Sequence, residues 1–187
     1  GAERVLAIMD EKTEDKSGNK KMDNLEGVIT FKNVNFSYVE GKRVLTDFNL
    51  KIASGHKVAL VGSTGSGKTT VVNLLMRFYD VDSGEILIDG INIKDIDCNE
   101  LRKNIGIVLQ DTVLFTDTVK NNLKYSNDNA SDEDMVNAAI MSNCDEMIRN
   151  LPSGYDTVLT QSGQNISQGQ KQLLCITRVM LLKPPML

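Results

Sequence analysis

A short stretch of the chain combines glycines, a lysine and hydroxyl groups in a spacing that suits phosphate binding. It consists of Gly62, Ser63, Thr64, Gly65, Ser66, Gly67, Lys68, Thr69 and Thr70, which matches the pattern Gly, any four residues, Gly-Lys-Thr. Glycines allow backbone turns that point successive N–H groups at phosphate oxygens, with no side chain in the way. The Lys68 ammonium can reach β- and γ-phosphates, and the Thr69 hydroxyl can ligate Mg²⁺. The stretch, a P-loop, predicts a nucleoside triphosphate site.

The segments on either side of the P-loop strengthen this prediction. Residues 58–61 are continuously apolar, which is typical of a strand buried on both faces of a parallel sheet. After the loop, Val71, Leu74, Leu75 and Phe78 follow helical spacing. A helix that begins here adds its positive dipole end to the phosphate site. A flexible glycine turn is the alternative, and it explains neither flanking element.

Alternating residues predict a second kind of sheet before the P-loop. Residues 28–38 place Val34, Phe36 and Tyr38 on one side, and residues 48–52 repeat the alternation. This pattern favours antiparallel strands with one solvent-facing side. After the P-loop helix, residues 86–91 predict a strand that runs into an Asp-Gly turn, and residues 105–109 predict another buried strand.

Beyond Gln110 the pattern becomes helical. Ser131 with Asp134 three residues later forms a capping-box arrangement at the start of a helix. Ser167 is the expected N-cap of a last helix that runs to Leu182. At the other end of the chain, residues 1–10 predict the end of an amphipathic helix. Residues 11–24 are almost wholly polar, so we expect a solvated linker and a domain edge near residue 25.

Composition narrows the classes of protein. Hydrophobic residues make up 41% and charged residues 25% of the 187 residues, as in ordinary globular domains. The net charge of −4 argues against a nucleic-acid binder held by bulk charge. Three widely spaced cysteines suggest neither a disulfide framework nor a zinc site. A single histidine excludes multi-histidine metal sites. No apolar run is long enough to span a membrane.

Three further segments carry a resemblance to ATP-binding-cassette (ABC) ATPases. Residues 166–170, Ile-Ser-Gln-Gly-Gln, resemble the family signature, usually Leu-Ser-Gly-Gly-Gln, about a hundred residues past the P-loop. Gln110 and the five residues that follow it resemble the family's Q-loop. Tyr38 stands where the family places an aromatic that stacks on adenine. Residues 101–115 look most like the exporter branch, whose ATPase is fused behind a transmembrane domain. The resemblance covers the chain from about residue 26 onward.

The resemblance implies an α/β fold of the P-loop NTPase (RecA-like) class, with a parallel-sheet core, an antiparallel β subdomain and a helical insert. Residues 1–25 would be a helix tail and polar linker from a preceding transmembrane domain, and residues 26–110 the β subdomain with the P-loop core. Residues 111–166 would form the helical subdomain, and residues 167–187 the signature helix returning to the core.

The same resemblance implies roles for individual residues, with ATP and Mg²⁺ as ligands. Gln110 would contact Mg²⁺ and the attacking water. Ser167, Gly169 and Gln170 would face the γ-phosphate of ATP bound by a second nucleotide-binding domain. Taken singly, each has a plainer interpretation: Tyr38 as a half-buried strand aromatic, Gln110 as the end of a strand, and Ser167 as an N-cap.

The sequence departs from the family at three places. Gln168 replaces the usual glycine of the signature, and residues 160–163 lack the acidic residue that exporters commonly have before it. After the signature helix, the family continues into a strand that ends in the Asp and Glu of the Walker B motif, followed later by a histidine. Residues 185–187 would begin that strand. We therefore expect a truncated, hydrolysis-deficient ATPase domain, because phosphoryl transfer depends on these charges.

The leading hypothesis is an ATPase domain of an exporter, at the cytoplasmic face of a membrane. It would drive export by ATP-dependent dimerisation with an identical or a different partner domain. An alternative is a module whose bound nucleotide controls assembly without turnover. A GTPase or kinase is less favoured, because the nearest text to the guanine-reading Asn-Lys-x-Asp pattern, residues 19–23, is one residue too long and precedes the P-loop. The transported substrate is not indicated.

Overall fold

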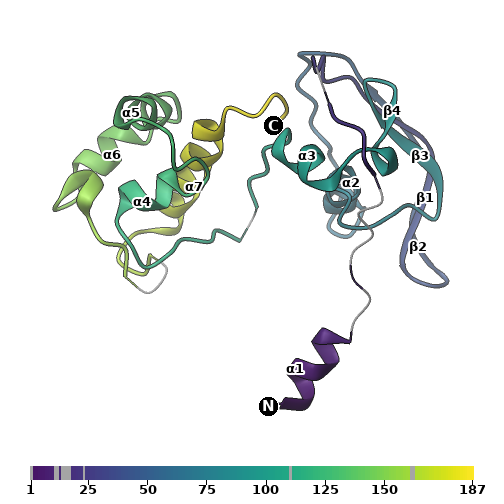
Figure 1. Ribbon diagram of the computed structural model, residues 1–187, viewed down its shortest axis with the longest axis horizontal. Coiled ribbons are helices and arrows are strands. Elements are labelled where there is room, and N and C mark those ends of the chain that lie inside the picture. Colours follow the sequence, from purple (N-terminus) through teal and green to yellow (C-terminus); the bar gives the residue numbers. More distant parts are fainter. Residues whose placement is uncertain (1, 11–12, 14–17, 23, 110, 161–162) are drawn as a thin grey trace. The chain divides into compact units, whose positions relative to one another are not determined.

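The computed structural model describes residues 2–10, 13, 18–22, 24–109, 111–160 and 163–187. The chain forms two compact units, Gly1–Arg102 and Lys103–Leu187 (Figure 1). The boundary between them lies after Arg102, whereas the sequence suggested a division after residue 110. Among the described residues, no helix combines the length and apolar character needed to cross a membrane.

The first unit is built around a four-stranded sheet in the order β2-β1-β3-β4 (Figure 1). Its strands are β1 (Ile29–Val39), β2 (Lys42–Ile52), β3 (Ser83–Ile88) and β4 (Ile91–Asn92). All three pairings are antiparallel, which confirms the expectation from the alternating residues. Large side chains on one side of the sheet are buried, in particular Ile29, Phe31, Val34, Phe36, Leu45, Ile86 and Ile88.

A bulge in β1 was not predicted. The buried positions change from Ile29 and Phe31 to Val34 and Phe36, an odd-to-even shift that needs one extra residue. Asn33 takes up the extra residue with a positive φ of 48°, and its N–H donates to the Asn49 side chain at 2.9 Å. Asparagine tolerates this left-handed conformation better than most residues. Downstream of the bulge, the even-numbered side chains of β1 therefore share the buried side.

The Asp-Gly turn between β3 and β4 is confirmed. Asp89 and Gly90 have φ values of 50° and 79°, as a two-residue hairpin turn requires. The Asp89 carboxylate accepts hydrogen bonds from the N–H groups of Glu26, Gly27 and Val28 at 3.0, 3.1 and 2.8 Å. Its role is thus structural, because it ties the segment before β1 to the turn.

The prediction of a buried strand at residues 58–61, before the P-loop, is wrong. Residues 57–62 form no strand pairing, and Val58, Leu60 and Val61 are 49%, 36% and 91% exposed. A buried strand needs neighbouring strands that satisfy its backbone N–H and C=O groups. Among the described residues, no strand pairs with this segment. The apolar run identified the segment but could not supply its neighbours.

The strand predicted at residues 105–109 is only begun. Ile105 forms one parallel bridge with Met186, and the Gly106 N–H donates to the Met186 carbonyl at 2.8 Å. Ile105 is buried, whereas Val108 and Leu109 are exposed. One bridge fixes the backbone at its own position and leaves the following residues without strand hydrogen bonds.

The polar stretch before β1 is not solvated throughout, which corrects the prediction for residues 11–24. Lys20 forms a parallel bridge with Ile96, and Met22 is buried. A Cβ on Gly18 would collide with the Ile96 carbonyl oxygen, so only glycine fits this approach. Polar side chains concealed the contact because the backbone makes it.

The helices of the first unit are α1 (Ala2–Met9), α2 (Lys68–Leu75) and α3 (Cys98–Lys103), with a short 3₁₀ turn η1 (Ile93–Asp95). The helical predictions for residues 1–10 and for the start of α2 are confirmed. Phe78 is not part of the helix and is 45% exposed. The helix ends earlier because Arg77 has a φ of 50°, which breaks the helical path.

The second unit is helical, as predicted for the region beyond residue 110. It contains α4 (Val119–Lys124), α5 (Asp132–Met141), α6 (Asp145–Arg149), η2 (Gly154–Asp156) and α7 (Gln168–Leu182). Helix α7 packs against α4 and α5. The side chains buried most deeply in this core are Leu114, Val119, Leu123, Met135, Ala139, Cys144, Ile148, Leu159, Leu174 and Leu181.

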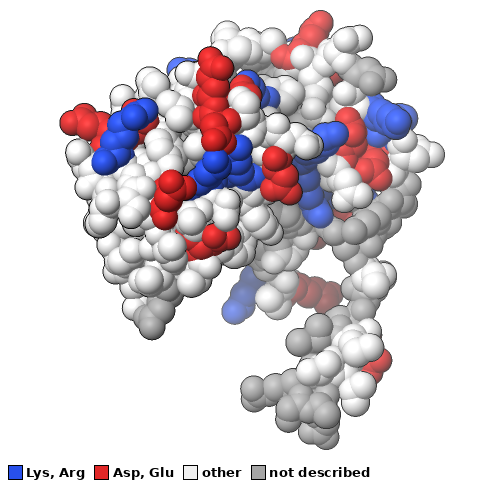
Figure 2. Space-filling view, turned by 60° about the vertical axis from the view of Figure 1, so that its left-hand side comes forward, with Lys and Arg blue, Asp and Glu red and all other residues white. Residues whose placement is uncertain are grey.

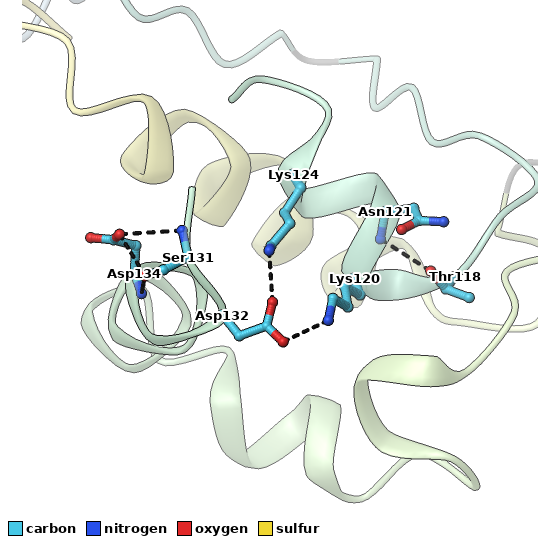
Figure 3. A network of polar contacts seen from close by, with 7 residues as sticks. All are labelled: Thr118, Lys120, Asn121, Lys124, Ser131, Asp132 and Asp134. Carbon is cyan, nitrogen blue, oxygen red and sulfur yellow. Dashed lines mark hydrogen bonds and ion pairs between the residues drawn. The ribbon is translucent and has the colours of Figure 1, made fainter. Parts of the chain in front are cut away.

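Charged side chains are interspersed on the face drawn in Figure 2, without a patch of one sign. In the second unit several of them pair. Asp132 at the start of α5 bonds Lys120 and Lys124 of α4, each at 2.6 Å (Figure 3). Asp134 bonds Lys183, just beyond the end of α7, at 2.9 Å. These ion pairs join the start of α5 to its neighbours.

Candidate functional site

The P-loop folds into a turn and is not drawn out along a strand. The Ser66 N–H donates to the Ser63 carbonyl at 3.2 Å. Gly65 and Gly67 have φ values of 84° and 87°, which glycine adopts without steric cost. A Cβ on Gly62 would lie 2.5 Å from the Ser66 Oγ. The loop therefore forms a closed curve, in which a side chain at Gly62 would collide with Ser66.

The Lys68 side chain folds back against this loop. Its ammonium donates to the carbonyls of Gly62 and Ser63 at 2.8 and 2.7 Å, and to the Ser66 hydroxyl at 3.3 Å. The ammonium therefore lies against the loop backbone, where a phosphate held by the loop N–H groups would meet it.

The start of α2 is left open for an anion. Gly67 is its N-cap and offers no side-chain hydrogen bond, while the first N–H groups of a helix have no partner inside the helix. Residues 62–66 and Thr69 are exposed, whereas Thr70 is only 4% exposed. Free N–H donors, a positive helix end and a nearby ammonium fit a polyphosphate.

Tyr38 lies beside the same helix. Its hydroxyl donates to the Thr70 hydroxyl at 3.2 Å and accepts from the Asn73 amide at 3.2 Å. The ring packs edge-on against Phe36 and Tyr79, with centroids 4.8 and 4.9 Å apart. It remains 44% exposed. The structure thus brings Tyr38 and the P-loop together, through the hydrogen bond between the Tyr38 and Thr70 hydroxyls.

The signature turn, residues 166–170, begins α7 in the second unit. Ser167 accepts from the Gln170 N–H at 3.2 Å, and the Gln170 side chain accepts from the Ser167 N–H at 2.8 Å. This capping box satisfies both residues locally. Ser167 and Gly169 are exposed, and a Cβ on Gly169 would meet nothing within 4 Å. The turn therefore faces open space, as an approach by another molecule requires.

Gln110 lies outside the described residues, so its predicted contacts remain predictions. The residues that follow it are described, and two of them, Thr112 and Val113, contact α7. The Gln168 amide donates to the Thr112 hydroxyl at 3.2 Å, and Leu114 is buried in the helical core.

The sequence analysis missed one polar centre beside these residues. Arg178 of α7 donates to the carbonyls of Val113 and Asn122 at 2.9 and 2.8 Å, and to the Asn122 side-chain oxygen at 3.1 Å. Burial lowers the pKa of Arg178. A signal was present, since Arg178 is the one charged residue within the apolar run 173–182.

Comparison with known proteins agrees with this geometry. Residues 45–187 match the family model described as ABC transporter. The ABC transporter ATP-binding protein YfiC of Bacillus subtilis is 47% identical over 189 residues. A fatty acid ABC transporter ATP-binding/permease protein of Mycobacterium bovis is 44% identical over 186 residues. The alignments cover 100% of this chain but only 31% and 30% of these relatives.

A solved structure is similar over nearly the whole chain. A bacterial Atm1-family ABC exporter with ATP bound superimposes with a TM-score of 0.86 at 35% identity. The match covers 98% of this chain and 32% of the exporter chain. It confirms the predicted fold class, the α/β fold of P-loop NTPases.

Proposed function

This chain belongs to the ABC transporter family, and from that premise we propose that it binds ATP and drives export across a membrane by ATP-dependent dimerisation. The observation that carries the proposal is the closed P-loop with the Lys68 ammonium against its backbone. Fixed donors of this kind stabilise charge that develops on transferring phosphate. Because the chain spans about a third of the relatives, export itself is a property of the whole protein.

The roles of the P-loop residues follow from their surroundings. Backbone N–H groups of residues 62–70 would hold the β- and γ-phosphates, with Lys68 as the compensating charge. Mg²⁺ would neutralise charge between phosphate oxygens, held by the exposed Thr69 hydroxyl and by Gln110. Tyr38 would stack on adenine through its exposed ring face, a contact worth about 1–3 kcal/mol per base in nucleic-acid binders.

A second copy, or a related domain, would complete the ATP site. Ser167, Gly169 and Gln170 lie on an exposed turn whose helix start is already capped. A capped, exposed turn can approach a phosphate of the partner without leaving its own backbone unsatisfied. ATP would thus join two domains, and hydrolysis would release them and shift the transmembrane partner between two conformations.

Lys68→Ala in a full-length protein that contains these residues is the decisive test. We expect ATP hydrolysis to fall about a hundredfold or more, because a fixed charge at the phosphates is lost. Lys57→Ala, at an exposed lysine outside the loop, serves as the control and leaves the rate unchanged. The rate of phosphate release and the binding of labelled ATP are measured on both variants.

Each outcome decides something. Equal rates for Lys68→Ala and wild type would overturn the proposal. ATP-dependent association without phosphate release would favour a nucleotide-controlled assembly module instead.

A further inference from the structure

Three side chains of helix α7 form hydrogen bonds with one segment of the second unit. We name residues 112–118 the connecting segment. Gln168, in the first turn of α7, donates to the Thr112 hydroxyl at 3.2 Å. Arg178, ten residues later, donates to the Val113 carbonyl at 2.9 Å. Between them, the Cys175 thiol lies 3.9 Å from the same carbonyl. Side chains from three positions of α7 therefore converge on Thr112 and Val113, two adjacent residues of the connecting segment.

Arg178 is bound in a way that a lysine could not reproduce. Its three bonded nitrogens reach the Val113 carbonyl and both oxygens of Asn122, at 2.9, 2.8 and 3.1 Å. The guanidinium also lies 5.7 Å from the ring centres of Phe115 and Tyr125. A planar fork with separate donors can bond several acceptors at fixed angles, whereas an ammonium is a point charge.

Asn122 extends this contact to the rest of the connecting segment. Its side chain is 1% exposed. The side-chain oxygen accepts from the Phe115 N–H at 2.8 Å, and the amide donates to the carbonyls of Phe115 and Thr118, both at 3.0 Å. Buried amides of this kind are costly unless fully bonded. Arg178 and Asn122 together hold the backbone of the connecting segment in one conformation.

These contacts form a continuous series from Arg178 to the signature turn. Arg178 holds Val113, the adjoining Thr112 receives Gln168, and Gln168 stands between Ser167 and Gly169. We propose that Arg178 is a positioning residue that orients the signature turn through Thr112 and Gln168. The proposal rests on the proposed function, because it assigns to the turn a contact with ATP of the partner. It also gives a use to Gln168, which stands where the family usually has glycine.

The test is a set of substitutions in a full-length protein that contains these residues. Arg178→Lys is expected to lower kcat about tenfold and to leave KM for ATP within about twofold, because the P-loop is untouched. Thr112→Val and Gln168→Gly, which each remove one hydrogen bond, are expected to lower kcat about threefold. Arg149→Lys, at an exposed arginine of α6, is the matched control and leaves both constants unchanged.

A double-mutant cycle separates positioning from general stability. If Arg178 acts through Thr112, then Thr112→Val has no further effect in the Arg178→Lys background. Effects that multiply, or a raised KM at constant kcat, would overturn the proposal. Hydrogen exchange at the Phe115 amide is measured on the same proteins without nucleotide, and faster exchange in Arg178→Lys is expected. Unchanged exchange would likewise overturn it.

The two proposals fail in different ways. If Lys68→Ala retains wild-type hydrolysis, the proposed function fails, although the exchange at Phe115 still reports whether Arg178 holds the connecting segment. If the protein associates in ATP without hydrolysis, the cycle is measured on the association constant, and the same non-additivity is expected. If Lys68→Ala abolishes hydrolysis while the cycle is additive, only the positioning role of Arg178 fails.

Discussion

Helices α2 and α7 begin in opposite ways. The N-cap of α2 is Gly67, with a φ of 87° and no side-chain hydrogen bond, whereas α7 begins with the Ser167–Gln170 capping box. The first helix leaves its N–H donors for a ligand, and the second satisfies its own. This difference fits the proposed function, in which an anion site inside one protomer needs free donors and a turn that docks on a partner must already be stable alone.

A third helix shows which part of this difference is specific. Helix α5 begins with the same kind of capping box, made by Ser131 and Asp134. The box alone is therefore a folding device and indicates no ATP contact. What distinguishes the signature turn is the exposed Gly169. A Cβ added there would meet no atom within 4 Å apart from its chain neighbours and the helix's own backbone.

The largest effect on this comparison is expected from Gly67→Ala. A Cβ there would lie 3.0 Å from Leu45 Cδ2, and the residue would keep a left-handed conformation. The conformation alone costs about 1–2 kcal/mol for a residue with a Cβ. We expect a lower free energy of unfolding by about that amount in urea titrations, together with a loss of ATP binding measured by a fluorescent analogue.

Gly169→Ala is the matched substitution at the other helix start. No atom obstructs a Cβ there, and alanine favours a helix over glycine by about 1 kcal/mol at interior positions. We expect an unchanged or slightly higher free energy of unfolding. Equal destabilisation by Gly67→Ala and Gly169→Ala would show that the two helix starts do not differ as described.

An intermediate effect is expected from removing each serine cap. Ser167→Ala and Ser131→Ala should each lower the free energy of unfolding by about 1 kcal/mol, because each breaks a capping box. Only Ser167→Ala should also lower ATP hydrolysis in a full-length protein. Thermal unfolding and steady-state rates are measured on both variants, and a comparable loss of hydrolysis in Ser131→Ala would argue that the effect is stability alone.

The smallest expected effect is on the pH dependence of the free energy of unfolding at acidic pH. Hydrogen bonds from Lys120 and Lys124 lower the pKa of Asp132 to about 2 from its ordinary value of 3.8 (Figure 3). A lowered pKa in the folded state means that the ionised form stabilises the fold above about pH 4, and that this contribution disappears as the pH falls through about 2. Residues 62–70 contain no acidic side chain, so the start of α5 should respond to acid before the P-loop does.

Asp132→Asn tests this pH dependence. The difference in free energy of unfolding between wild type and variant should be constant above pH 4 and should shrink below it. Glu133→Gln, at an exposed neighbour on the same helix, serves as the control. A difference that stays constant down to pH 2 would mean that the two lysines do not hold the Asp132 carboxylate in solution.

Features that depend on neighbouring residues were predictable. The P-loop turn, the Asp89-Gly90 hairpin and the caps of α5 and α7 all appear where the sequence placed them. Each depends on which φ values a residue can adopt or on a hydrogen bond to a residue three positions away. Such interactions are short in sequence, so the order of residues contains them.

Strands beside the P-loop were less predictable. Residues 58–61 are as apolar as a buried strand, yet they are exposed and unpaired among the described residues. Periodicity reports the environment that a segment prefers and not the partner that provides it. The docking of Lys20 on Ile96 was missed for the related reason that backbone groups, which all residues share, make the contact.

The amino-acid sequence alone thus determined that a glycine-rich P-loop turn and a capped signature helix exist, because glycine conformation and capping are local chemistry. The tertiary structure decided that Tyr38 adjoins Thr70 and that Arg178 holds Val113 and Asn122, partners separated by 32, 65 and 56 positions in the chain. Such pairs meet only after the bulge in β1 and the packing of α7 on α4 are in place. Their hydrogen bonds depend on the relative positions of distant segments, which no single residue specifies.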